Sequence, residues 1–165
     1  MLSAMESFEG HENLHPSLQR AGAGDVETLI AIEQSVPKTD VYSPMLTESG
    51  WQKEMAQYTV DLIKISEKAV GSIAYAEKEP GHVYISGVIV SPEYQGRGIA
   101  RSAIQQILDA YSNAYRIDLV THPDNPALKL YESLGFKVEE RKEDYFGDGQ
   151  PRLVLALTRE PQVPV

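Results

Sequence analysis

Cysteine is absent from this chain of 165 residues. Its absence excludes disulfides, thiolate metal sites, iron–sulfur clusters and cysteine nucleophiles together. The GxSxG motif, which carries the nucleophile of many serine hydrolases, is absent as well. The four histidines lack the spacing of metal ligands and stand at His11, His15, His82 and His122. We therefore expect neither a metal site nor a thiol or serine nucleophile.

Basic residues are scarce relative to acidic ones. Lysine and arginine number 15 against 24 aspartates and glutamates, which gives a formal net charge of −9. A nucleic-acid-binding domain usually carries a basic excess, so nucleic acid is not an expected partner. The acidic balance attracts cations over long range and favours a cationic ligand without specifying which one.

Long apolar runs are missing too. No stretch approaches the roughly 20 residues of a membrane span, and residues 1–15 lack the basic end and apolar core of a secretion signal. We expect a cytoplasmic protein with no membrane partner. Hydrophobic residues make up 42% of the chain, close to the globular average, so a folded core is expected.

The chain divides into one domain with two short ends. Residues 1–15 are polar and without periodicity, which is typical of a flexible arm. Residues 161–165 read PQVPV, and their two prolines indicate a tail. The remaining residues, 16–160, are expected to form a single domain.

Hydrophobic periodicity within this domain alternates between helix and strand. Apolar residues at helical spacing predict helices that start at Asp25 as N-cap, that carry Trp51 and Met55, and that span 98–111 and 127–134. Short apolar runs predict strands near Leu18 and at 60–66, 69–77, 82–90, 116–121, 136 to about 146, and 152–158. The order predicts an α+β domain with a mixed, mostly antiparallel sheet of about seven strands and about four helices.

The clearest chemical signal is the stretch VIVSPEYQGRGIAR at 88–101. An apolar strand ends there, and a glycine-rich turn opens an amphipathic helix. Helix N-termini leave backbone N–H groups without helical partners and carry positive partial charge, so they bind phosphate groups. Gly96 and Gly98 allow the backbone to approach an anion where a Cβ would obstruct it. The stretch predicts a pyrophosphate site, with a strand–turn–helix that merely has capping glycines as the alternative.

Two common phosphate loops are excluded by the same stretch. A Walker loop requires GxxxxGK[ST], which occurs nowhere in the chain. A dinucleotide loop requires GxGxxG, but after Gly96 and Gly98 the third glycine position holds Arg101. The pattern that remains is Gln95-x-x-Gly98-x-Ala100.

This pattern resembles the [QR]xxGx[GA] loop of the GCN5-related N-acetyltransferase (GNAT) superfamily, which holds the pyrophosphate of acetyl-CoA. A second stretch, DNPALKLYESLGFKV at 124–138, is similar to the late helix of that family, usually written NxxAxxLYxxxGF. The two motifs lie at the family's usual distance and together cover residues 88–138. The resemblance implies a GNAT-like fold and an N-acetyltransferase that moves an acetyl group from acetyl-CoA to a primary amine.

The resemblance also implies how acetyl-CoA is held. In the family the strand before the loop diverges from the next strand, and the pantetheine arm pairs with backbone groups in the gap. Here those groups, with the oxyanion donor among them, belong to Val88, Ile89 and Val90. The pyrophosphate would be bound by Gln95, Gly96, Arg97, Gly98, Ile99, Ala100 and Arg101, although the two arginines also fit a solvated first helical turn. The family's asparagine falls on Asp124 without a gap or on Asn125 with one deletion, and we favour Asn125 as a cofactor contact.

For catalysis, the resemblance implies that Tyr131 protonates the departing thiolate. Its helical spacing also fits a core tyrosine. The general base is not readable, because the strand position that holds glutamate in many relatives is Leu119 or Val120 here. The remaining candidates are water and the side chains of Asp118, His122 and Glu93.

The acceptor is less defined than the cofactor. Residues 129–157 resemble the bacterial ribosomal-protein alanine N-acetyltransferases, including an aromatic pair, Tyr145-Phe146, that in those relatives helps shape the peptide slot. This favours a protein N-terminus as the acceptor, whereas a hairpin with packed aromatics is the structural alternative. A polyamine or an aminoglycoside-like amine is the alternative substrate, and a non-catalytic acyl-CoA-binding domain is the alternative function. The oligomeric state is not readable, and a homodimer stays open.

Overall fold

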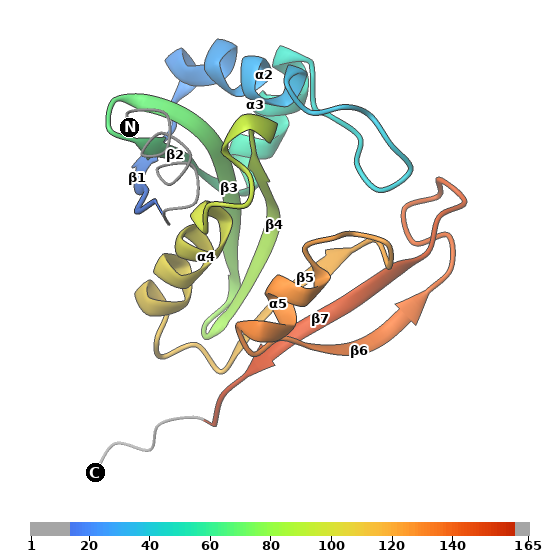
Figure 1. Cartoon of the computed structure of the whole chain (residues 1–165). Helices are drawn as coiled ribbons and strands as arrows, with labels where there is room; N and C mark the ends of the chain where they lie inside the picture. Colours follow the sequence, from blue (N-terminus) through green and yellow to red (C-terminus); the bar gives the residue numbers. More distant parts are fainter. Residues whose placement is uncertain (1–13, 161–165) are drawn as a thin grey trace, which may run out of the picture.

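The computed structural model describes residues 14–160, which form seven strands and four α-helices in an α+β arrangement (Figure 1). The sheet order is β1-β2-β3-β4-β5-β7-β6. Its strands are β1 (Ser17–Arg20), β2 (Thr59–Ile65), β3 (Lys68–Glu79), β4 (His82–Val90), β5 (Arg116–Thr121), β6 (Lys137–Lys142) and β7 (Arg152–Thr158). The helices are α2 (Val26–Gln34), α3 (Glu48–Gln57), α4 (Ile99–Ala110) and α5 (Leu128–Ser133), with short 3-10 turns η1 (Ala23–Asp25) and η2 (Pro92–Tyr94).

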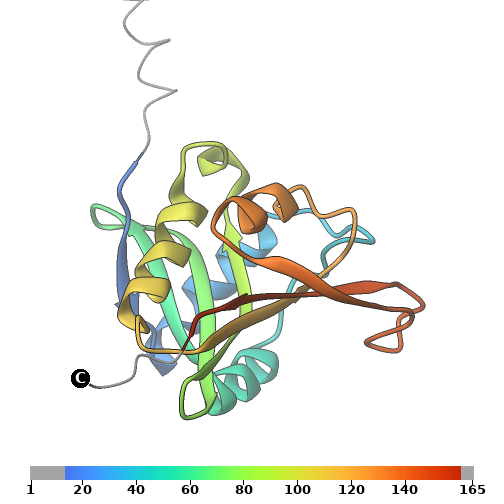
Figure 2. The same cartoon turned by 90° about the horizontal axis from the view of Figure 1, so that it is seen from below.

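Helices cover both faces of the sheet. Figure 2 shows α4 and α5 on one side of the strands and α3 on the other. The core under α4 includes Ile99 and Ile104 with Ile85 and Ile117 of the strands, all nearly inaccessible to solvent. On the opposite face, α2 and α3 bury a second core of Val26, Leu29, Ile32, Trp51, Val60, Leu62 and Ala74. The sheet thus separates an α4/α5 face from an α2/α3 face.

The sheet opens in its middle. β4 pairs with β5 in parallel only from His82 with Arg116 to Ile85 with Leu119, and the rest of β4 stays on β3. Figure 1 shows β4 diverging from the β5–β7–β6 half. At the point of divergence the β3–β4 register skips from Ile85 to Gly87, which leaves Ser86 as a bulge. The expected gap after the central strand is therefore present.

Most sequence-based elements are confirmed within a residue or two, and the end of one strand was wrong. Asp25 stands at the N-cap of the first helix as expected, but its side chain makes no cap hydrogen bond there. Its carboxylate instead accepts the Gly22 N–H, because the chain first makes the turn η1. The strand expected to reach about residue 146 ends at Lys142, because Asp144 (φ 51°) and Gly147 (φ 76°) take left-handed conformations that interrupt an extended chain.

The expected ends of the domain lie mainly outside the described part. The arm at 1–15 falls there except for its last two residues, and so does the tail at 161–165. Within residues 14–160, no helix has the length and apolar character that a membrane crossing requires. The same residues hold no group of three or more potential metal-binding side chains.

Candidate active site

The glycine loop joins β4 to α4 through two left-handed residues. After η2, Gly96 and Gly98 both have φ 77°, a conformation that costs an L-residue with a Cβ roughly 1–2 kcal/mol. A Cβ built on Gly96 would meet no atom within 4 Å, so the space beside the loop is open. Glycine is therefore required by the conformation of the backbone rather than by crowding.

The end of this loop presents donors to an anion. Among the described residues, no carbonyl accepts from the backbone N–H groups of residues 96–101, while the carbonyl of Gly98 already starts the helix by accepting from Ser102. These groups stand at the positive end of the α4 dipole. A pyrophosphate therefore fits this cradle on the chemistry of its donors.

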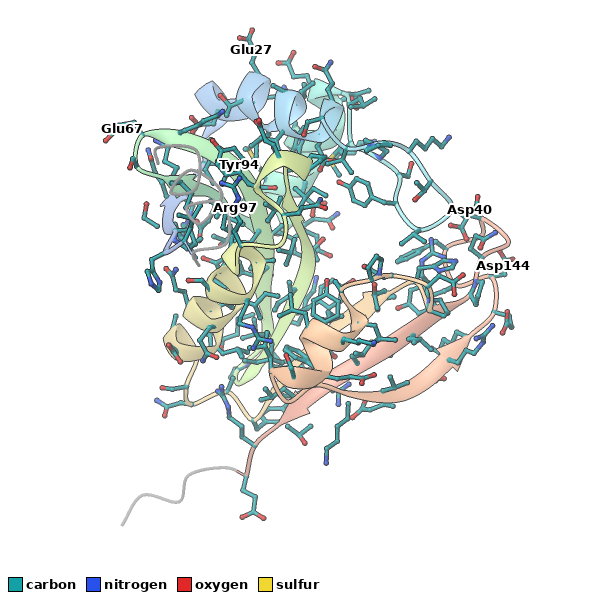
Figure 3. The ribbon with its side chains drawn as sticks, in the orientation of Figure 1. Glu27, Asp40, Glu67, Tyr94, Arg97 and Asp144 are labelled. Carbon is teal, nitrogen blue, oxygen red and sulfur yellow. The ribbon has the colours of Figure 1, made fainter. Side chains whose placement is uncertain are left out.

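The side chains around the loop have structural partners. The Gln95 amide donates to the Val90 carbonyl at 2.9 Å and so ties the loop to the end of β4. The Arg97 guanidinium lies 5.6 Å from the centre of the Tyr94 ring. Figure 3 labels both residues beside the loop before α4. Arg101 reaches from α4 to Ser133 of α5 at 2.5 Å. The two arginines place positive charge on either side of the helix start.

The three strand residues expected to bind the pantetheine arm do not point the same way. Ser91 donates to the Val70 carbonyl across to β3, and residues of an antiparallel strand alternate in the direction of their backbone groups. By this alternation Ile89 turns its N–H and C=O toward β3. Val88 and Val90 turn theirs toward the gap beside β5. An extended amide chain lying in the gap thus has the backbone of Val88 and Val90 as its strand-like partner.

Of the two candidates for the family's asparagine, Asn125 is the one whose side chain is held by hydrogen bonds within the turn. Its side-chain amide donates to Thr121 Oγ1 at 2.8 Å, and its Oδ1 accepts the Ala127 N–H at 2.9 Å. The Asp124 side chain is 84% exposed. Asn125 therefore fixes the turn between β5 and α5.

Tyr131 lies on the α4/α5 face with 8% of its surface exposed. Its ring packs edge-on against Phe136 at 6.3 Å between centroids. Burial raises the pKa of Tyr131 to about 12. With this pKa the hydroxyl of Tyr131 stays protonated at neutral pH. Because no other described residue hydrogen-bonds to it, the hydroxyl is also available as a donor.

The side chains considered as general base are held elsewhere. Asp118 accepts from His82 at 2.9 Å and from Arg116 at 3.0 Å. Buried His122 accepts the Asp124 N–H at Nδ1 and contacts the Gln150 amide oxygen at Nε2, so both ring nitrogens are engaged. Glu93 lies at the surface beside Lys68.

A cavity of about 380 Å³ opens on the face of the sheet away from α4 and α5. Its lining comes from the four strands β3, β4, β5 and β7, from the residue after α3 and from the turn after β6, and consists of Tyr58, Lys78, His82, Tyr84, Asp118, Val120, Tyr145 and Val154. The Lys78 ammonium lies 4.5 Å from the Tyr58 ring centre and 5.7 Å from that of Tyr84. The cavity is therefore partly aromatic and carries charges of both signs.

The aromatic pair predicted for the acceptor is split between cavity and surface. Tyr145 lines the cavity, whereas Phe146 is 60% exposed and has the Arg152 guanidinium 5.2 Å from its ring centre. Both lie in the β6–β7 turn rather than in a strand. That turn, marked by Asp144, faces the α2–α3 loop, marked by Asp40, on the same side of the molecule (Figure 3).

One further carboxylate near the gap was not predicted from the sequence. Glu54 of α3 accepts a hydrogen bond from Ser86 Oγ at 2.7 Å, at the bulge where β4 leaves β5. In the sequence, the helical spacing of Trp51 and Met55 indicates the apolar side of α3, and Glu54 is not part of that pattern. A bulge in β4 depends on its register with β3, which no local pattern in the sequence reveals.

Together, the diverging seven-stranded sheet and the glycine loop at the start of α4 define the GNAT class of proteins. The model of the Acetyltransferase (GNAT) family matches residues 26–136, and the chain belongs to this family. The expected family and the expected fold are thereby confirmed.

Relatives of known name differ in their substrates. The chain is 33% identical over 88 residues to the catalytic subunit NAA20 of the N-terminal acetyltransferase B complex of Arabidopsis thaliana. The matched segment covers 50% of this chain and 51% of that protein. It is 39% identical over 75 residues to spermidine N(1)-acetyltransferase of Escherichia coli strain K12, with 42% and 40% covered. The chain thus spans about half or less of these relatives' lengths.

Solved structures agree on the fold. The ribosomal-protein-S18-alanine N-acetyltransferase of Escherichia coli superposes with a TM-score of 0.75 at 19% identity, over 90% of this chain and 96% of the other. A GNAT family acetyltransferase of Elizabethkingia anophelis, solved with acetyl-CoA bound, gives a TM-score of 0.67 at 14% identity, over 88% and 99%.

Proposed function

We propose that the protein is an acetyl-CoA-dependent N-acetyltransferase that acetylates a primary amine. The observation that carries this proposal is the loop of Gly96 and Gly98, whose left-handed backbone leaves the N–H groups at the start of α4 directed to an anion. This loop opens beside the gap between β4 and β5. Family membership supports the same donor.

The chain's own groups divide the work of binding. The N–H groups of residues 96–101 bind the pyrophosphate, with Arg97 and Arg101 adding positive charge. The backbone of Val88 and Val90 pairs with the pantetheine amides, as an added strand would. When bound, acetyl-CoA supplies the acetyl group as a thioester.

The role proposed for Tyr131 is that of general acid toward the thiolate. Its hydroxyl belongs to the α4/α5 side of the sheet, in the same apolar cluster as Ile85 and Leu119, where the gap closes. A phenol that stays protonated is a proton donor to a thiolate. Asn125 acts by fixing the turn that leads into the helix of Tyr131.

A protein N-terminus is the acceptor we favour. Tyr145 lines a cavity that lies between the β6–β7 turn and α3, and the chain shares 33% identity over 88 residues with a catalytic subunit of an N-terminal acetyltransferase complex. A polyamine is the second candidate, because the net charge of −9 attracts polycations and a spermidine acetyltransferase is 39% identical over 75 residues.

Thiol release from acetyl-CoA tests the proposal directly, because the chain itself has no cysteine that would react with a thiol reagent. The acceptors are short peptides with N-terminal alanine, serine or methionine, and spermidine, L-amino acids and an aminoglycoside. We expect release that depends on the amine and is fastest with a peptide. Fastest release with spermidine would reassign the acceptor. Binding of acetyl-CoA without release from any amine would instead make the chain an acyl-CoA-binding domain.

A further inference from the structure

The bulge at Ser86 marks the place where the gap in the sheet closes. The last β4–β5 pair is Ile85 with Leu119, and Ser86 is the next residue of β4. It has no partner on β3 because the register jumps from Ile85 to Gly87. An extended chain that enters the gap from the loop of α4 therefore ends beside Ser86.

One carboxylate is held at this point. Ser86 Oγ donates to Glu54 Oε1 at 2.7 Å, across 32 residues of sequence, and Glu54 is only partly buried. The hydroxyl of Ser86 is a neutral donor and occupies only Oε1 of the carboxylate. Asp118, by contrast, is bound by an imidazole and a guanidinium, and both nitrogens of His122 are engaged.

Glu54 and Tyr131 approach the end of the gap from opposite faces. Glu54 belongs to α3 and Tyr131 to α5, which lie on different sides of the sheet (Figure 2). The cavity lies on the side of Glu54, and Tyr58, one helical turn further along the chain, forms part of its wall. The lining does not include Glu54 itself, but an amine that enters through this cavity arrives on the side of the sheet that carries Glu54, whereas Tyr131 is on the far side.

We propose that Glu54 is the general base of the transfer, a role that rests on the proposed function. Its carboxylate takes one proton from the acceptor ammonium, which leaves the neutral amine. The amine nitrogen then forms a bond to the thioester carbonyl carbon, the C–S bond breaks, and the nitrogen releases its second proton to water. The Tyr131 hydroxyl gives its proton to the sulfur and recovers one from water. The Ser86 hydroxyl positions the carboxylate at the closed end of the gap.

The charged surroundings of Glu54 suit the arrival of an ammonium group. The buried carboxylate of Glu33 on α2 lies within electrostatic range of Glu54. Burial raises the pKa of Glu33, and the charge of Glu54 adds a smaller increase. From β4, the Tyr84 phenol is also within range, and burial raises its pKa. On the cavity wall, Lys78 lies beside Tyr58. Glu54 thus has a second carboxyl group, that of Glu33, within electrostatic range.

Glu54→Gln is the test, because the amide keeps the size of the side chain and an oxygen that accepts from Ser86. Glu48→Gln is the matched control, since Glu48 is an exposed carboxylate in the first turn of the same helix. With the best amine of the panel, we expect Glu54→Gln to lower kcat by about 10²- to 10⁴-fold. In Glu54→Gln, the Kd for acetyl-CoA measured by calorimetry should equal that of the wild type. Glu48→Gln should have the kcat and the Kd of the wild type.

The pH profile separates a base from a merely structural role. Without a base only the neutral amine reacts, and its fraction rises with pH up to the amine pKa, about 8 for an α-amino group. The ratio of wild-type to Glu54→Gln turnover should therefore shrink as pH rises. A large but pH-independent ratio, or wild-type turnover in Glu54→Gln, would overturn the role of Glu54 alone. If the wild type acetylates no amine, the proposed function falls first and this inference with it.

Discussion

Tyr131 combines deep burial with a hydroxyl that no other described residue binds. Replacing it with phenylalanine keeps the ring and its edge-on contact with Phe136. As the general acid, Tyr131 would act only when the thiolate leaves, so Tyr131→Phe should lower kcat by about 10²- to 10⁴-fold with little change in the KM for acetyl-CoA. Steady-state thiol release at saturating acetyl-CoA measures the ratio. A ratio near one would make Tyr131 a core residue whose hydroxyl has no catalytic role.

The same burial predicts an alkaline effect on stability. Because folding raises the pKa of Tyr131 to about 12, the native state holds this proton where the unfolded chain has lost it. The contribution is complete below the unfolded pKa of about 10 and is lost as pH rises through about 12, at up to about 1.4 kcal/mol per pH unit. Denaturant melts at neutral and alkaline pH should show a smaller alkaline loss for Tyr131→Phe than for the wild type. Equal losses would contradict a role for this phenol.

At this scale, the two catalytic candidates show what a sequence can and cannot indicate. Tyr131 was predicted because it stands at a fixed place in the stretch 124–138 that resembles the family's late helix, whereas its helical spacing also fitted a core tyrosine. Glu54 was not predicted, because its significance depends on the hydrogen bond to Ser86, 32 residues away. At Asp25 the N-cap position was predicted but the hydrogen bond of its side chain was not, since an aspartate before a helix serves equally well as acceptor for an earlier turn.

Among the helices and strands, α4 depends on one particular residue, the glycine at position 98 where the helix begins. Gly98→Val places a β-branched residue at φ 77° and a side chain where the anion would approach. Acetyl-CoA binding should be abolished in calorimetry. Gly149→Val is the matched control, because Gly149 has φ 75° in the β6–β7 turn and so imposes comparable strain away from the loop. Unchanged affinity in Gly98→Val, or an equal loss in both variants, would remove the loop from the binding site.

The same elements explain how much of the fold the sequence could predict. Alternating and helical periodicities located the seven strands and four helices of the described residues, because most of them bury one face in one of the two cores. The end of β6 was misplaced, since this edge strand is exposed throughout and has no buried face to mark its length. Pairing was predicted no further than a mixed, mostly antiparallel sheet. The direction of the Ile89 backbone, by contrast, depends on register and could not be read.

For the whole molecule, the cosubstrate should act as a stabiliser. A ligand that binds only the folded chain adds about 2.7 kcal/mol to the free energy of unfolding at a concentration 100 times its Kd. Acetyl-CoA and CoA should raise the Tm in a thermal-shift series, whereas NAD and ATP should not, because the loop fits neither a dinucleotide nor a Walker pattern. Stabilisation by NAD without stabilisation by acetyl-CoA would contradict the assignment of the loop.

The short pairing between β4 and β5 has a mechanical consequence for the molecule. The two halves of the sheet are joined along four residue pairs, from His82 with Arg116 to Ile85 with Leu119. The core under α4 continues across both halves, with Ile85 in one and Ile117 in the other. In the proposed complex, the amides of acetyl-CoA would pair with β4 inside the gap and so lengthen this junction beyond its four residue pairs. Release of the product would return the junction to those four pairs.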